Sequence, residues 1–206
     1  MTDRQAIEPQ IDRRPIITSE SDPIRVDFLP HELTGLPGRL GMTIAPGKRN
    51  IGMHAIWERD LEQDLTHLRH HYRVEKLVTL LETPEFAALQ IPNLLIQVQA
   101  HGMRSQQFPI RDFGTPTSME SLLELVESIL EDVAQGQTVV IHCKAGLGRT
   151  GLVTAACLVA LGYSPEEAFA LVRQSRPGSI ETPEQETYAE AFAKAWQARD
   201  TRDRGA

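Results

Sequence analysis

The stretch TVVIHCKAGLGRTG, residues 138–151, joins a predicted strand to a predicted helix and carries a cysteine at the junction. The β-branched run before Cys143 is typical of a buried strand, and the apolar sequence after Arg149 is typical of a helix packed against a sheet. Gly146 and Gly148 lie in the loop between them. A strand, a glycine-bearing loop and a helix in this order form an anion site, because loop N–H groups and the helix N-terminus converge on one point.

The spacing of cysteine and arginine in this loop suits a phosphoryl group. Five residues separate Cys143 from Arg149, so the loop can wrap an oxyanion while the guanidinium returns to hold two of its oxygens bidentately. Gly146 and Gly148 tolerate the backbone angles that turn the loop amides inward. In such a field Cys143 is expected to be a thiolate, which is a nucleophile toward phosphorus.

Three other interpretations of the loop explain less. The nucleotide P-loop requires a lysine followed by Ser or Thr, and the chain has no such pair here. A zinc site is not predicted, since His142 and Cys143 are adjacent and no C-x-x-C accompanies them. A cysteine that only fills the core at a strand end would leave the glycines, Arg149 and Thr150 unexplained.

The composition is that of one acidic globular domain. The chain has 206 residues, of which 41% are hydrophobic, and this suffices for a single core. A formal net charge of -7 predicts no nucleic-acid partner and no general adsorption to membranes. No apolar run is long enough to span a bilayer, and the first residues lack the apolar core of a secretory signal.

Cysteine content and end composition complete this outline. Two cysteines are too few for a disulfide framework and fit a reducing compartment, so we expect a cytoplasmic protein. We also expect a monomer. The first residues are polar and proline-punctuated, and the last are charged. We therefore expect a flexible N-terminal segment over 1–23, one folded domain over 24–198 and a charged tail over 199–206.

Strands and helices alternate along the chain, which predicts an α/β fold with a central, largely parallel sheet flanked by helices. A T-x-x-E capping box at Thr117 predicts an amphipathic helix that ends at Gly136. Ser164 and Thr182 are each followed by proline and begin two further helices. The other strands are expected at 24–29, 38–45 and 76–81, and the other helices at 57–72, from Pro84, and over 92–102.

The loop resembles a known signature. HCKAGLGRTG is similar to the H-C-x-x-G-x-x-R-[ST] motif of the cysteine-dependent protein tyrosine and dual-specificity phosphatases. GLPG, IPNLLIQVQAHG, FPIRDFGTPT and RPGSIETPEQETYAEAF resemble, in order and spacing, the cyclin-dependent-kinase-associated subgroup, so the resemblance covers about residues 25–195. It implies a protein tyrosine phosphatase-like fold, a catalytic domain, and hydrolysis of phosphomonoesters through a cysteinyl-phosphate without a cofactor or metal.

This chemistry requires a proton donor for the leaving oxygen. Between Pro84 and Cys143 the only aspartates are Asp112 and Asp132. Asp132 falls in the last turn of a predicted amphipathic helix and is expected to be a solvated face residue. Asp112 lies in a loop flanked by proline and glycine that could cover the site, at the place where the resembled family carries its general acid. The alternative for Asp112 is a turn-forming residue.

The resemblance gives the rest of the loop its roles. Thr150 is expected to donate its hydroxyl to the thiolate, or else to be a simple N-terminal helix residue. His142 is expected to position the loop, and Lys144 to be exposed and attract acidic substrates. Gln185 either orients the hydrolytic water or closes a T-x-x-Q capping box. The predicted substrate-binding residues are His142, Lys144, Ala145, Gly146, Leu147 and Gly148.

Two features of the sequence bear on the substrate class. The chain has no tyrosine-bearing recognition loop, so we expect a shallow pocket that admits phosphotyrosine, phosphoserine and phosphothreonine in a phosphorylated protein or peptide. Because Lys144 also occurs at this place in some phosphoinositide phosphatases, a phosphoinositide or another small phosphomonoester remains an alternative. A non-catalytic phosphate reader is a third, which the combination of Cys143, Arg149 and Asp112 disfavours.

Two other features have plainer interpretations. His67, His70 and His71 lie at helical spacing and could hold a metal, but no carboxylate or cysteine pattern completes them, so a polar helix face is favoured. Cys157 lies among alanines and leucines in the middle of a predicted helix and is expected in the core, not in a disulfide with Cys143.

Overall fold

The computed structural model describes residues 13–203, and at its centre is a five-stranded sheet. The strand order is β2-β3-β8-β6-β7, in which only β2 runs antiparallel to its neighbour. The predicted α/β fold with a central, largely parallel sheet is therefore confirmed. The strands are β2 (Asp27–Phe28), β3 (Arg39–Thr43), β6 (Lys76–Thr79), β7 (Arg104–Gln107) and β8 (Thr138–His142).

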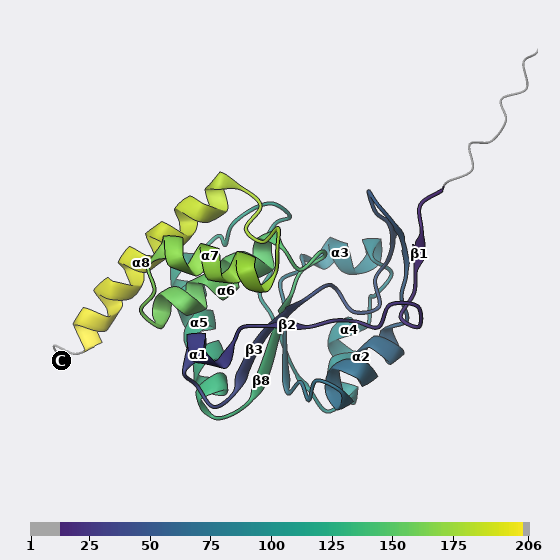
Figure 1. Cartoon of the computed structure of the whole chain (residues 1–206), viewed down its shortest axis with the longest axis horizontal. Helices are drawn as coiled ribbons and strands as arrows, with labels where there is room; N and C mark the ends of the chain where they lie inside the picture. The colour runs from purple at the N-terminus through teal and green to yellow at the C-terminus, as the bar shows by residue number, and fades with distance from the viewer. Residues whose placement is uncertain (1–12, 204–206) are drawn as a thin grey trace, which may run out of the picture.

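Helices cover both faces of this sheet (Figure 1). On one face lie α5 (Met119–Ala134), α6 (Gly148–Ala160), α7 (Pro165–Ser175) and α8 (Pro183–Asp203). On the other lie α2 (Leu61–His70), α3 (Thr83–Ala88) and α4 (Leu94–Ala100), and α1 (His31–Thr34) is a single turn. Each layer forms its own hydrophobic cluster against the sheet, and every residue of the central strand β8 is buried. The residues that follow β8 therefore start from a rigid position.

A second, three-stranded sheet was not predicted. It consists of β1 (Ile16–Ile17), β5 (Ile56–Glu58) and β4 (Arg49–Ile51), in this order. The prediction of a helix from residue 57 is wrong, because Trp57 and Glu58 pair with β4. Helix α2 starts only at Leu61, where the Asp60 side chain accepts a hydrogen bond from Gln63 N. An aspartate N-cap satisfies one of the free amides of the first turn and so sets the start of the helix.

Parts of the predicted terminal segments have regular structure. Strand β1 lies inside the predicted N-terminal segment 1–23 and pairs in parallel with β5. Helix α8 continues through Asp203, into the predicted tail 199–206. Residues 1–12 and 204–206 lie outside the described residues, and the three-part division of the chain stays a prediction.

Two details of helix α5 differ from expectation. The capping residue is Ser118 and not Thr117, since the Ser118 hydroxyl accepts from Ser121 N at 3.2 Å. Asp132 is buried rather than solvated, and it pairs with Lys76 and Arg104 at 2.7 Å each. Burial alone would raise the pKa of Asp132, but these two cations lower it. Asp132 therefore ties α5 to strands β6 and β7.

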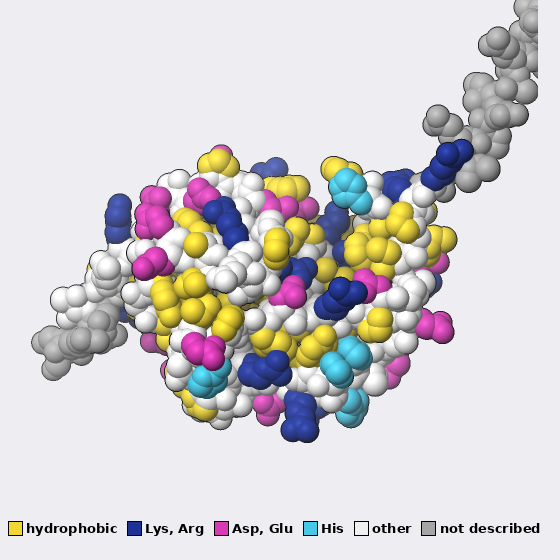
Figure 2. Space-filling model, viewed as in Figure 1, with side chains coloured by type: hydrophobic (Ala, Val, Ile, Leu, Met, Phe, Trp, Pro, Cys, Tyr) yellow, Lys and Arg dark blue, Asp and Glu magenta, His cyan; other side chains and the backbone are white. Residues whose placement is uncertain are grey.

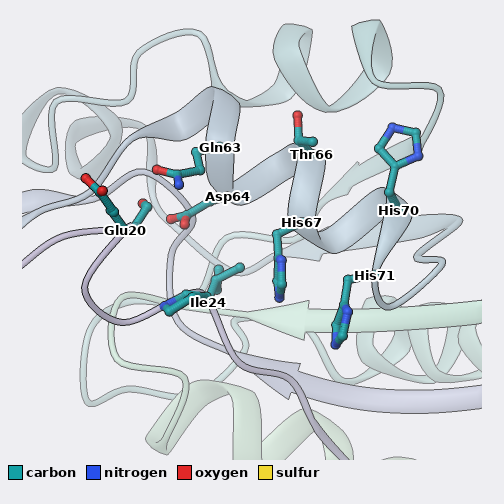
Figure 3. A pocket seen from close by; sticks show the side chains of 10 residues that line it. Glu20, Ile24, Gln63, Asp64, Thr66, His67, His70 and His71 are labelled. Carbon is teal, nitrogen blue, oxygen red and sulfur yellow. The ribbon is translucent and has the colours of Figure 1, made fainter.

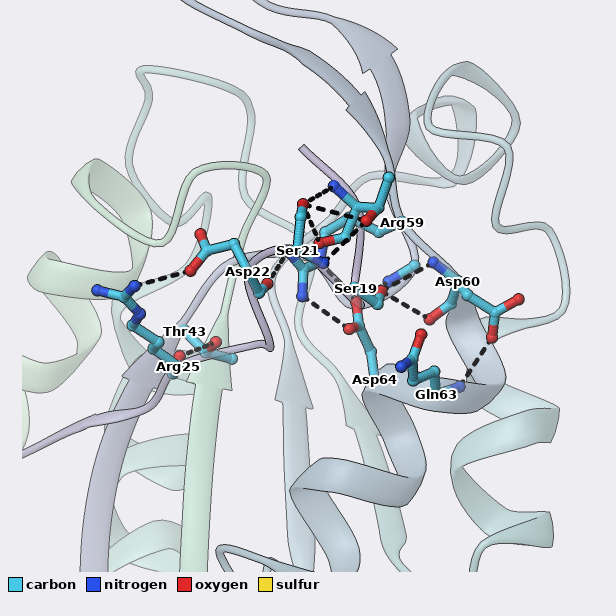
Figure 4. A network of polar contacts seen from close by, with 11 residues as sticks. Ser19, Ser21, Asp22, Arg25, Thr43, Arg59, Asp60, Gln63 and Asp64 are labelled. Atoms are coloured by element: carbon cyan, nitrogen blue, oxygen red, sulfur yellow. Dashed lines mark hydrogen bonds and ion pairs between the residues drawn. The ribbon is translucent and has the colours of Figure 1, made fainter. Parts of the chain in front are cut away.

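A buried ion pair fixes the junction between β5 and α2 (Figure 4). Arg59 donates from Nε and Nη2 to the two carboxylate oxygens of Asp64, both at 2.8 Å. The Asp64 carboxylate also accepts from Gly47 N, and Arg59 Nη1 donates to the carbonyl of Asp22. The pair thus connects the segment before β2, the loop before β4 and the start of α2.

The surface of the described chain is mixed in character. On the face in Figure 2, acidic and basic side chains are interspersed, and hydrophobic side chains form several patches among them. Within residues 13–203, no helix is both long enough and apolar enough to cross a membrane.

Candidate active site

The loop after β8 emerges between two other parallel strands. His142, the last residue of β8, is in register with Thr43 of β3 on one side and Thr79 of β6 on the other. In open α/β sheets, ligand sites form at this carboxyl end of the strands. Cys143 follows directly, with only 3% of its surface exposed, and Gly146 N donates to its Sγ at 3.2 Å. The loop therefore curls back so that one of its amides faces the sulfur.

Cations hold this loop from behind, which the sequence did not reveal. Arg176 donates from Nε to Gly146 O at 2.6 Å and from Nη2 to Ala145 O at 3.0 Å, and it pairs with Asp27 of β2. Lys48 Nζ donates to Lys144 O at 3.3 Å. Because three successive carbonyls accept from outside the loop, the amides on the opposite side of these peptides are free to face its interior.

Gly146 is required by this curvature. Its φ is +71°, in the left-handed region, and a Cβ there would lie 2.2 Å from the carbonyl oxygen of Thr43. The predicted substrate-binding residues run from His142 at the end of β8, through the loop, to Gly148 at the start of α6, and their role in binding stays a prediction. Along this stretch Ala145 is exposed, Lys144 and Leu147 are half-buried, and Gly146 and Gly148 are buried. Lys144 is therefore less exposed than expected.

Arg149 is buried in the first turn of α6 and makes four hydrogen bonds. Nη1 and Nη2 donate to the two carboxylate oxygens of Glu85, at 2.6 and 2.9 Å. Nη1 also donates to Ile110 O at 3.0 Å, and Nη2 donates to Asp112 Oδ1 at 2.8 Å. Burial alone would lower the pKa of Arg149, but the hydrogen bonds to Glu85 and the charges of Cys143, Glu85 and Asp112 raise it. The guanidinium is therefore a fixed cation.

Glu85 is another side chain of the candidate site that sequence reasoning missed. It lies in the first turn of α3, and its Oε2 also accepts from Glu82 N at 2.9 Å. A glutamate at this position normally indicates only a capping interaction. The contact with Arg149 joins residues 64 positions apart, and no local pattern records it.

Asp112 is brought to the loop as predicted, and Asp132 is not. The Asp112 side chain is 42% exposed and contacts Arg149 from the segment between β7 and α5. The following residue, Phe113, has a left-handed φ of 58° and is itself exposed. A carboxylate on an exposed segment can both reach the loop and withdraw from it.

His142, which directly precedes Cys143, and Thr150, in the first turn of α6, are both fully buried. His142 Nδ1 lies 3.1 Å from Cys143 O, a carbonyl that can only accept, so Nδ1 carries the proton and Nε2 accepts from the Thr79 hydroxyl at 2.9 Å. Burial lowers the pKa of His142 to about 4, which keeps the ring neutral. The Thr150 hydroxyl has no hydrogen-bond partner among the described residues.

Gln185 does not close the predicted capping box. Its backbone N donates to Thr182 Oγ1 at 3.2 Å, but its side chain reaches other groups. Oε1 accepts from Glu181 N at 2.9 Å, and Nε2 donates to Gly114 O at 3.2 Å. Gln185 therefore links the segment that carries Asp112 to the segment before α8.

Lys48 is the second buried cation near the loop. Its ammonium lies 3.7 Å from the centre of the Trp57 ring. Burial, and then the charge of Arg59, lower the pKa of Lys48 to about 7, while Cys143 acts in the opposite direction. Lys48 and Arg176 thus both bind the outer carbonyls of the loop.

His67 and His70 of α2, and His71 directly after it, lie elsewhere, beside a cavity of about 300 Å³ (Figure 3). His67 and His71 are stacked with ring centres 4.5 Å apart, and His70 points away from them. Among the described residues, no group of three or more His, Cys, Asp or Glu side chains could hold a metal ion.

Cys157 lies in the core, as expected. It is fully buried in α6, and burial raises the pKa of its thiol to about 12. It is nine residues beyond the first residue of the helix, which corresponds to roughly 13 Å of helical rise.

The fold and the loop define a class of protein: the chain is a cysteine-dependent protein tyrosine or dual-specificity phosphatase. A family model described as "Polymorphic toxin system, DSP-PTPase phosphatase" matches residues 51–163, and the chain belongs to this family. The resemblance drawn from the loop motif is confirmed.

Particular relatives are similar to this chain over most of its length. The chain is 29% identical to cyclin-dependent kinase inhibitor 3 of Mus musculus over 180 residues, which cover 85% of this chain and 82% of that protein. The Homo sapiens protein of the same name is also 29% identical, over 179 residues with the same coverage of 85% and 82%. The predicted similarity to the cyclin-dependent-kinase-associated subgroup is confirmed.

Solved structures agree with this assignment. The crystal structure of kinase associated phosphatase, with its catalytic-site cysteine replaced by serine, has a TM-score of 0.77 and 28% identity. That comparison covers 85% of this chain and 97% of the other. The active form of Tk-PTP has a TM-score of 0.65 and 30% identity, covering 82% of this chain and 96% of that one.

Proposed function

We propose that this phosphatase hydrolyses phosphotyrosine, phosphoserine and phosphothreonine in proteins through a cysteinyl-phosphate on Cys143. One observation carries the proposal: Asp112 Oδ1 lies 2.8 Å from Nη2 of the buried Arg149, at the end of the loop that begins with Cys143. Arg149, the proposed phosphate clamp, and Asp112, the proposed proton donor, thus come from separate segments and are in direct contact. Membership of the phosphatase family supports the reaction class.

The orientation of Arg149 favours a bidentate contact with phosphate. Its four hydrogen bonds use Nη1 and Nη2, which leaves Nε without a partner among the described residues. If a phosphoryl oxygen displaces Asp112 from Nη2, then Nε and Nη2 present two parallel donors to the phosphoryl group. The same displacement frees the Asp112 carboxyl.

In the first step, the Cys143 sulfur attacks phosphorus while the ester P–O bond breaks. Asp112 donates its proton to the leaving seryl, threonyl or tyrosyl oxygen, which departs as an alcohol or phenol. The loop amides and Arg149 stabilise the charge on the transferring group, since they are oriented before the reaction starts.

In the second step, a water oxygen attacks the cysteinyl-phosphate and the S–P bond breaks. The water proton passes to the Asp112 carboxylate, which restores the acid, and the sulfur leaves as a thiolate. The unpartnered Thr150 hydroxyl can donate a hydrogen bond to that thiolate. His142 acts as a positioning residue, because its proton is directed to the Cys143 carbonyl.

A phosphorylated protein or peptide is the substrate class we favour. The similar proteins are named for kinases, one as an inhibitor of a cyclin-dependent kinase and one as a kinase associated phosphatase. The loop itself adds Lys144, a half-buried cation that suits an acidic peptide. A phosphoinositide would use the same cation, so it belongs in the test.

The test is phosphate release in the presence of a chelator from three substrates: a phosphotyrosine peptide, a phosphothreonine peptide and a soluble phosphoinositide. The wild type is compared with Cys143→Ser, and with Cys157→Ser as the matched control. We expect release from both peptides, loss with Cys143→Ser and retention with Cys157→Ser. Release from the inositide alone would contradict a protein substrate, and equal activity of Cys143→Ser would contradict the nucleophile.

A further inference from the structure

A carboxylate occupies one amide of the phosphate-binding loop. Gly148 N, the first amide of α6, donates to Glu181 Oε2 at 2.8 Å. Leu147, the N-cap of this helix, provides no side-chain cap of its own. A helix N-terminus attracts negative charge, so Glu181 takes a place that suits a phosphoryl oxygen equally well.

The contact depends on the absence of a side chain at position 148. A Cβ on Gly148 would lie 2.4 Å from Glu181 Oε2 and 3.1 Å from Gln185 Nε2. Glycine at this position therefore lets a carboxylate approach the loop directly. The same close approach would also let a phosphoryl group reach the amide.

The backbone presents Glu181 rigidly. Ile180, the residue before it, has a left-handed φ of 61°, which is strained for a β-branched residue. Arg173 holds this turn by donating to the carbonyls of Ser179 and Ile180, both at 3.1 Å. Gln185 Oε1 accepts from Glu181 N at 2.9 Å. Three hydrogen bonds thus hold the main chain here, whereas the Glu181 side chain is exposed and can move away from Gly148 N.

We propose that the Glu181 carboxylate competes with phosphate for the Gly148 amide and so lowers the affinity of the loop for oxyanions. This inference rests on the proposed function. An incoming phosphoryl group must displace the carboxylate and then bind next to a negative charge. Both effects weaken binding of substrate and of oxyanion products in the ground state, so Glu181 limits how long phosphate remains on the loop after turnover.

The experiment measures the affinity of the loop for tungstate, a tetrahedral oxyanion, by titration calorimetry on the full chain. Glu181→Gln keeps the shape of the side chain and removes its charge. Glu184→Gln makes the same charge change at an exposed residue three positions further on, in the first turn of α8, and is the control. We expect Glu181→Gln to bind tungstate at least about tenfold tighter, because a hydrogen bond from an amide to a charged group no longer competes.

Glu181→Ala provides a second variant, and circular dichroism verifies that each variant is folded. We expect Glu181→Ala to bind tungstate at least as tightly as Glu181→Gln. Equal or weaker binding by both variants, relative to the wild type, would overturn the role of Glu181. In that case the proposed function would stand if Arg149→Met abolished the binding, whereas tungstate binding to none of the proteins would overturn both.

Discussion

At the scale of single residues, the most informative contact is the one between Arg149 and Glu85. A guanidinium has five N–H donors in a fixed plane, and Glu85 takes one pair of them at 2.6 and 2.9 Å. The contact with Glu85 therefore leaves the edge formed by Nε and Nη2, which is the edge that we propose for phosphate. An ammonium could not be oriented in this way, so a lysine at position 149 would keep the charge and lose the direction.

Replacing Glu85 with Gln should lower kcat/KM for a phosphopeptide by roughly 10- to 100-fold, because a charge-assisted pair worth about 1.5–3 kcal/mol is weakened. Steady-state kinetics at fixed pH measure the effect. Glu82→Gln, on the same helix end but not bonded to Arg149, should stay within about twofold of the wild type. A normal kcat/KM in Glu85→Gln would show that the loop alone orients Arg149.

Asp112→Asn should reveal the proton donor through the leaving group. We expect roughly a 10²–10⁴-fold lower kcat on a phosphothreonine peptide, because an alkoxide is a poor leaving group without protonation. The loss should be much smaller on an aryl phosphate whose phenol is acidic. Parallel assays on the two esters test this, and equal losses on both would assign Asp112 another role.

At the scale of elements, the loop is held in place by partners distant in sequence. Arg176 binds its outer carbonyls, and the central strand β8 supplies a rigid start between β3 and β6. The local parts of this arrangement could be predicted: β8 is the run directly before Cys143, and Ser164 begins a helix as expected, with both hydrogen bonds of a capping box. Such features depend on a few neighbouring residues, so the sequence pattern contains them.

The parts that could not be predicted are those that pair distant residues. Glu85 and Arg176 reach the loop from 64 and 30 positions away. Asp132 meets Lys76 across 56 positions, so a helix-face pattern could not show that it is buried. The three-stranded sheet consists of strands only two or three residues long, below the length at which alternation is recognisable.

Gly146→Ala tests whether the loop tolerates a side chain. A methyl group at this position would meet the Thr43 carbonyl at 2.2 Å and would also impose a left-handed φ. We expect loss of phosphatase activity and a lower Tm. Gly136→Ala is the matched control, since Gly136 also has a positive φ but no atom within 4 Å of the added Cβ, and it should keep full activity. Retained activity in Gly146→Ala would contradict the close packing.

At the scale of the whole molecule, buried polar groups join the layers of the fold. Hydrophobic contacts alone are non-directional and would not fix how these layers lie relative to one another. The Arg59–Asp64 pair connects the small sheet to α2, and Asp132 connects α5 to the edge of the main sheet. His142 lies between β3 and β6, where its ring bonds to Thr79. Breaking such a pair leaves an uncompensated group in the interior, which costs more than the pair contributes.

His142 should make the free energy of unfolding depend on pH. Its pKa is lowered from 6.5 to about 4 in the folded protein, so between these values the unfolded chain binds more protons. The stability from a neutral His142 is complete above pH 6.5 and is lost as pH falls toward 4, by about 3 kcal/mol.

Urea unfolding at several pH values measures this dependence. His142→Asn should be less stable at neutral pH but should show a flatter slope between pH 6.5 and 4 than the wild type. His70→Asn, an exposed histidine of α2, should keep the wild-type slope. If His142→Asn kept that slope too, the pH dependence would come from other groups.

The position of Cys157 has a consequence for oxidation. A nucleophilic cysteine, the role that we propose for Cys143, can be oxidised to a sulfenic acid, which a nearby second thiol can capture as a disulfide before further oxidation. The chain has two cysteines, and Cys157 is fully buried, with a thiol pKa raised to about 12. A disulfide requires Cα atoms within about 7 Å, and Cys157 lies roughly 13 Å of helical rise beyond Gly148, the first residue of α6. Recovery from oxidation must therefore come from an external reductant, so reactivation should depend on the thiols of the surrounding solution.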